Sequence, residues 1–103
     1  MKIDWSELAI LDLEGIKEFI QRDSEYYALE FTGRIIEMIE KLSSFSNLGK
    51  KVPEVDDESI REVVFCNYRI IYKLCDELIL VLAIIHAARD LNNMKPQPWE
   101  NTT

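Results

Sequence analysis

The hydrophobic pattern of this chain changes once, from a helical period in the first half to a strand-like period in the last third. Between residues 7 and 42, apolar side chains recur every three to four positions, which is the spacing of one face of an α-helix. Between residues 60 and 85, β-branched residues are frequent and apolar side chains either alternate with polar ones or form short continuous runs. The pattern predicts an α+β fold, with helices packed on one face of a mainly antiparallel sheet.

Two amphipathic helices are expected in the first half. Ser6 is the predicted N-cap of the first, which runs to about residue 22, and residues 22–25 break the pattern and supply a cap for the second. So short a break predicts an antiparallel hairpin. Gly15 interrupts the first helix, either because the second helix approaches closely or as a tolerated defect. The predicted core residues are Leu8, Leu11, Ile16, Phe19 and Ile20 in the first helix, and Ala28, Phe31, Ile35, Ile39 and Leu42 in the second.

Four strands are expected, one before the hairpin and three after it. The run at 78–85 is apolar on both faces, which predicts a central strand covered on both sides. The first strand should pair along its free side, so the expected sheet order is first, fourth, third, second. A loop at 43–59 joins the helices to the last three strands. We expect one domain at 1–91 and a polar tail at 92–103. The expected strands are 2–5, 60–66, 68–74 and 78–85.

The chain is acidic, with a formal net charge of -7 from 19 acidic and 12 basic residues. Phosphate backbones repel such a chain unless its basic groups gather on one face. No targeting segment is visible, and the apolar run at 78–88 is too short to span a membrane. Cys66 and Cys75 flank one predicted strand, too far apart for a disulfide. These features predict a cytoplasmic protein with reduced thiols and no membrane contact.

Several short strings, taken in order, carry a family resemblance. With the predicted order of elements, they resemble the RelE/ParE toxin superfamily (plasmid stabilisation proteins) of type II toxin–antitoxin systems over nearly the whole chain. The resemblance implies a small toxin that a cognate antitoxin protein neutralises, with a disordered antitoxin segment folding on the toxin. It also implies that operator DNA is bound only through the antitoxin. The strings are Trp5-Ser6, Leu13-Glu14-Gly15-Ile16, residues 48–54, Ile60-Arg61-Glu62, residues 68–72 and residues 86–90.

The resemblance also points to candidate catalytic residues. In the ribosome-dependent mRNA endonucleases of this superfamily, one Arg on the third strand and one after the fourth stabilise the phosphate undergoing cleavage. Arg69 and Arg89 match those positions. A guanidinium can meet the negative charge of a phosphoryl transition state with two parallel hydrogen bonds. His86, the only histidine, is the candidate general acid or base.

Structural explanations for the same residues stay open. Arg69 can instead pair with an acidic side chain across the sheet, and Arg89 with the adjacent Asp90. His86 at a strand end can be a hydrogen-bonded structural residue. One His and two Cys at these positions do not make a zinc site, and no phosphate-binding glycine loop or nucleophile elbow is present. No metal or cofactor is expected.

The nuclease pattern of the superfamily is incomplete in this chain. The superfamily's nucleases resemble one another in lysines on or near the second helix and in a late Tyr. Here Lys50 and Lys51 lie in the predicted loop, Ala88 precedes Arg89, and no Tyr follows Tyr72. With the charge of -7, these departures favour a ParE-like inhibitor of DNA gyrase without an active site. Two alternatives remain: a RelE-like endonuclease (mRNA interferase) that acts on the ribosome, and an inert homologue that binds its antitoxin in operon autoregulation.

Overall fold

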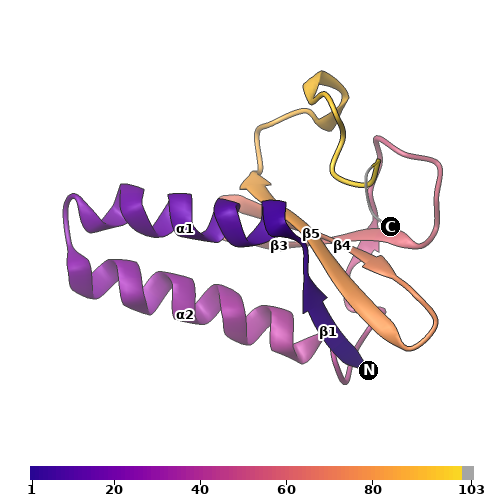
Figure 1. Cartoon of the computed structure of the whole chain (residues 1–103), viewed down its shortest axis with the longest axis horizontal. Helices are drawn as coiled ribbons and strands as arrows, with labels where there is room; N and C mark the ends of the chain where they lie inside the picture. Colours follow the sequence, from indigo (N-terminus) through magenta and orange to yellow (C-terminus); the bar gives the residue numbers. More distant parts are fainter. Residues whose placement is uncertain (101–103) are drawn as a thin grey trace.

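The computed structural model describes residues 1–100, which form a helical hairpin packed on one face of a twisted sheet (Figure 1). The chain runs strand, two helices, then strands to the C-terminal segment, as the sequence predicts. The elements are β1 (Lys2–Trp5), α1 (Glu7–Gln21), α2 (Glu25–Lys41), β2 (Lys50–Lys51), β3 (Ile60–Phe65), β4 (Tyr68–Leu74), β5 (Leu78–His86) and the 3-10 turn η1 (Leu91–Asn93).

The first helix begins at its predicted cap, Ser6, and Ser24 is the residue within the predicted segment 22–25 that caps the second. The Ser6 hydroxyl oxygen accepts a hydrogen bond from the Ala9 N–H at 3.1 Å, and Ser24 does the same for Tyr27 at 3.1 Å. Ser6 also ties α1 to the sheet, because its hydroxyl donates to the carbonyl of Leu82 at 3.0 Å. One residue therefore both starts the helix and fixes its entry angle onto β5.

The predicted core stripe is confirmed for α2 but is partly wrong for α1. In α2, Ile35 and Ile39 are buried against the sheet. In α1, the helix is rotated so that Ala9 and Ile16 face the core. Both stripes of α1 have helical spacing, and periodicity alone does not say which one meets the sheet. The remaining buried residues of the α2 stripe are Ala28 and Leu42, and the α1 residues wrongly assigned to the core are Leu8, Leu11 and Phe19.

The sheet has the predicted order with one further strand at its edge, β1-β5-β4-β3-β2. β1 runs parallel to β5, and all other neighbours are antiparallel. The extra strand, β2, lies within the segment predicted as a loop and pairs with β3. Two residues are too few to produce an alternating pattern, so the sequence holds no signal for β2.

Central strand β5 is buried on both faces, as predicted. The hairpin covers one face, where Ile84 packs with Ile16 and Ile35. The loop after β2 and the C-terminal segment cover the other face, where Leu82 and Leu91 are fully buried. The polar tail predicted at 92–103 is therefore docked at least through Trp99, and its residues 101–103 lie outside the described part. No helix in residues 1–100 is long and apolar enough to span a membrane.

Candidate functional site

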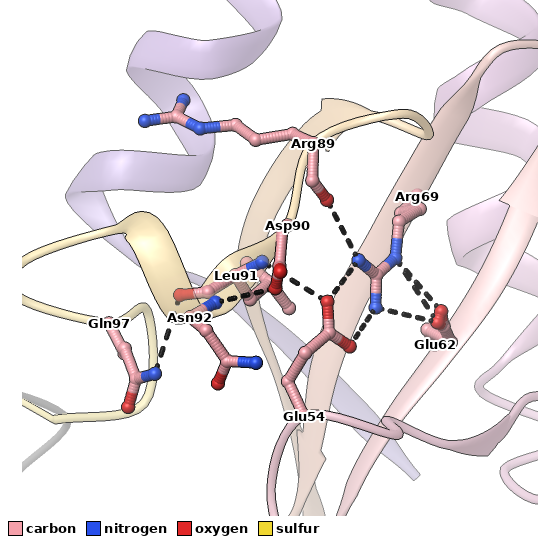
Figure 2. A network of polar contacts seen from close by, with 8 residues as sticks. All are labelled: Glu54, Glu62, Arg69, Arg89, Asp90, Leu91, Asn92 and Gln97. Carbon is pink, nitrogen blue, oxygen red and sulfur yellow. Dashed lines mark hydrogen bonds and ion pairs between the residues drawn. The ribbon is translucent and has the colours of Figure 1, made fainter.

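Arg69 lies at the centre of a buried ion cluster on the face of the sheet opposite the hairpin (Figure 2). Its guanidinium meets Glu54 with two parallel hydrogen bonds of 2.7 Å, from Nη1 and Nη2. Nε and Nη2 donate to Glu62 at 2.9 and 3.0 Å. Nη1 also donates to the carbonyl of Arg89 at 3.1 Å, and Glu54 accepts from the N–H of Leu91 at 3.1 Å. We call Glu54, Glu62 and Arg69 the Arg69 cluster.

Every N–H of the Arg69 side chain is used, four by Glu54 and Glu62 and one by the carbonyl of Arg89. A guanidinium has five N–H donors, and all five point at protein oxygens at hydrogen-bonding distance. The side chains of Arg69, Glu54 and Glu62 are only 8%, 11% and 5% exposed. The hydrogen bonds from Arg69 hold the pKa of Glu54 at about 2, and those from Glu54 raise the pKa of Arg69. Glu54 is therefore ionised at neutral pH, and Arg69 has no N–H left for an added anion.

His86 lies on the other face of the sheet from Arg69. Tyr68 pairs with His86 across β4 and β5, and their rings meet edge to face at 5.9 Å. Tyr68 also contacts Phe31 of α2, so its face is the hairpin face. Because adjacent strand residues point to opposite faces, Arg69 points away from both. The exposed His86 ring accepts a hydrogen bond from the Ala88 N–H at 3.2 Å, which is a local structural contact.

Arg89 touches the Arg69 cluster only through its backbone carbonyl (Figure 2). Its side chain is turned away, and its charge acts on Asp12 of α1. Burial raises the pKa of Asp12, whereas a hydrogen bond from the Ile84 N–H at 2.9 Å and the charge of Arg89 oppose the rise. Arg89 and Asp90 are not among the ion pairs of residues 1–100, and Asp90 instead caps η1. The local pairing considered for them is wrong.

The three candidate catalytic residues are thus not assembled into one site. Of the explanations open for Arg69, pairing across the sheet is the one observed. The sequence left such a pairing open for Arg69, but neither acidic partner was identified from it. Glu62 had a signal, because it is a charged residue at an inward position of an apolar strand, diagonal to Arg69. No such signal marks Glu54, because only the folding of its loop brings this residue to Arg69.

The fold is that of a small helical hairpin on a mainly antiparallel sheet, with Arg69 held inside the protein rather than open to a substrate. A family model described as ParE toxin of type II toxin–antitoxin system, parDE, matches residues 3–91. The chain belongs to this family, within the RelE/ParE superfamily of toxins. No curated protein sequence matches the chain.

The solved structures that share this fold include two toxin–antitoxin systems. The chromosomal ParDE toxin–antitoxin system of P. aeruginosa has a TM-score of 0.71 and 20% identity, covering 84% of this chain and 95% of that one. The toxin–antitoxin complex RelBE2 of Mycobacterium tuberculosis has a TM-score of 0.61 and 18% identity, covering 82% and 95%. At these identities the likeness is one of fold alone. One of the two structures is described as a ParDE system and the other as a RelBE2 complex, so the fold does not separate the ParE and RelE branches.

Glu54 should make the stability of the protein depend on acid pH. Its pKa in the folded protein, about 2, is below the ordinary value of 4.5. A lowered carboxyl pKa stabilises the fold above the ordinary value, and this stabilisation is lost as pH falls from about 5 to about 2. We expect Glu54→Gln to lower the free energy of unfolding by about 2 kcal/mol at pH 7. This gap in stability between the wild type and the variant should shrink towards pH 3. Thermal melts followed by circular dichroism at pH 7, 5, 4 and 3 measure the gap.

The matched control for this experiment is Glu58→Gln. Glu58 is exposed on the same loop, so its amide variant should melt with the wild type at each pH. A Glu54→Gln gap that stays constant between pH 7 and pH 3 would contradict the assignment.

Proposed function

We propose that this chain is a ParE-like toxin that acts by binding DNA gyrase and carries no catalytic site of its own. The observation that supports this most directly is the saturation of Arg69. All five of its N–H donors are engaged by protein oxygens, and its side chain is 8% exposed. A residue that stabilises a scissile phosphate needs free donors directed at the substrate.

The arrangement of the other candidates supports the same proposal against a nuclease. General acid or base catalysis requires the acting group within hydrogen-bonding reach of the reacting atoms. His86 and Arg69 lie on opposite faces of the sheet, so they do not converge on one phosphate. The net charge of -7 also opposes entry into a phosphate-lined cavity. An inhibitor that acts by binding a protein needs neither converging catalytic groups nor entry into a phosphate-lined cavity.

Neutralisation by a cognate antitoxin protein is part of the proposal, with operator DNA bound through that antitoxin and the whole system cytoplasmic. Family membership and two structural neighbours described as toxin–antitoxin systems support it. A ligand that binds only the native state raises its stability by about 4 kcal/mol at a thousandfold excess over Kd. The chain should therefore co-purify with the product of a neighbouring small reading frame and melt at a higher temperature in that complex.

The target is tested with the purified wild-type protein in two assays. We expect it to inhibit supercoiling by gyrase, or to trap cleaved DNA, and to leave ribosome-bound mRNA uncut. Induction of the protein alone in cells should produce double-strand breaks and the SOS response. These results follow if the chain acts by binding a protein.

Arg89→Ala is the discriminating variant. It removes the one candidate guanidinium whose side chain lies outside the Arg69 cluster, so it tests nuclease chemistry with little risk to the fold. We expect its gyrase inhibition to equal that of the wild type. Ribosome-dependent cleavage by the wild type that falls about a hundredfold in Arg89→Ala would overturn the proposal in favour of a RelE-like endonuclease. Absence of activity in both assays would favour the inert homologue.

A further inference from the structure

The tip of the helical hairpin exposes three large aromatic side chains. The hairpin extends away from the sheet, and its tip is the part farthest from β3 and β4 (Figure 1). At this tip, Phe19, Tyr26 and Tyr27 are 64%, 74% and 63% exposed. Single exposed apolar residues are ordinary, but a group of exposed aromatic residues on one projection marks an interaction site.

The tip is held in one conformation by local contacts. The N–H groups of Asp23 and Ser24 both donate to the carbonyl of Ile20 at 3.0 Å, and the Ser24 side chain caps α2. The Arg22 guanidinium lies over the Phe19 ring, 5.9 Å from its centroid. The Tyr26 and Tyr27 rings meet edge to face at 6.2 Å. Binding through a tip that is already ordered loses little conformational entropy.

We propose that the hairpin tip, formed by Phe19, Arg22, Tyr26 and Tyr27, docks into an apolar recess of the target protein that is rimmed by basic side chains. Tyr, Phe and Arg are enriched in the cores of protein interfaces, and Tyr and Arg are among the commonest hot-spot residues. This inference rests on the proposed function, since it names the surface by which the chain would engage a protein target.

The charge of the hairpin tip favours a protein partner with a basic surface. Four carboxylates surround the tip between residues 17 and 30, against the two cations Lys17 and Arg22. This acidic surface is repelled by nucleic acid, by anionic membranes and by the same tip of a second copy. It is complementary to Arg and Lys side chains, which also bind to the faces of exposed aromatic rings. The four carboxylates are Glu18, Asp23, Glu25 and Glu30.

The test is the variant Phe19→Ala/Tyr26→Ala/Tyr27→Ala. We expect it to need at least about a thirtyfold higher concentration than the wild type for half-inhibition of gyrase supercoiling. Its induction should no longer arrest growth, while its melting temperature and its co-purification with the antitoxin are kept. The matched control is Phe45→Ala/Leu48→Ala on the loop after α2, where Phe45 is also 64% exposed and Leu48 is 51% exposed. The control should inhibit as the wild type does.

A second variant tests the tip without removing any ring. Asp23→Lys/Glu25→Lys reverses the charge of two exposed tip residues and keeps the Ser24 cap. It should weaken inhibition about tenfold at low salt, and the loss should shrink as salt screens the tip.

The outcomes separate this inference from the proposed function. A wild type that arrests growth without inhibiting gyrase overturns gyrase as the target. The growth assay then still tests whether the hairpin tip binds the target. A folded triple variant that arrests growth at the wild-type dose overturns the proposal that the hairpin tip binds the target. Loss of antitoxin binding with growth arrest retained also overturns it, because the surface then serves the antitoxin. A wild type inactive in both assays overturns both proposals.

Discussion

Replacing Arg69 with methionine should lower the free energy of unfolding by about 4 kcal/mol, because it leaves two carboxylates buried without a counter-charge. The side chains of Glu54 and Glu62 are 11% and 5% exposed, and both depend on Arg69 for hydrogen bonds. The Leu91 N–H and the carbonyl of Arg89 are bound to the same cluster, so the C-terminal segment should loosen as well. Urea denaturation at pH 7 measures the loss.

Two further variants identify the cause of this loss of stability. Arg69→Lys keeps the positive charge but offers three donors in place of five, so its loss should be smaller than that of Arg69→Met. Adding Glu54→Gln and Glu62→Gln to Arg69→Met removes the unpaired charges and should recover part of the stability. A folded Arg69→Met protein with wild-type stability and no growth inhibition would show instead that Arg69 contacts the target.

Gly49→Ala should destabilise the protein by about 3 kcal/mol, the combined effect of a steric overlap and disturbed buried hydrogen bonds. A Cβ at Gly49 would lie 2.4 Å from the backbone oxygen of Glu62 and 2.6 Å from the Tyr72 hydroxyl. The Gly49 N–H donates to that hydroxyl at 3.0 Å, and the hydroxyl donates to the carbonyl of Ser46 at 3.0 Å. The added methyl group therefore pushes the loop after α2 off the sheet. The expected fall in Tm is more than about 10 °C for a domain of this size.

Gly33→Ala is the control for this substitution. An added Cβ at Gly33 meets no atom within 4 Å, and Gly33 lies inside α2. Alanine there should raise stability by about 0.5–1 kcal/mol, because glycine is a poor helix residue. Equal effects at positions 33 and 49 would show that Gly49 has no special place in the packing.

Gly15 shows how far the sequence alone can go with a residue of this kind. Two explanations were open for it, close approach of the second helix or a tolerated defect. A Cβ there meets no atom within 4 Å, so no helix approaches closely. Gly49, which the sequence marked only as a turn former, is the glycine that packing requires.

The sequence by itself determined the local structure of this protein. Helix caps, helical spacing and strand alternation act within a few residues. The Ser6 cap, a second cap within residues 22–25, the α2 stripe with Ile35 and the meander up to the doubly buried β5 were therefore predicted correctly. Only the tertiary structure decided which stripe of α1 meets the sheet, that β2 extends it, and that Arg69 is enclosed by Glu54 and Glu62. These features depend on contacts between segments 7 to 15 or more residues apart, and their energies are set by burial and geometry that no local pattern records.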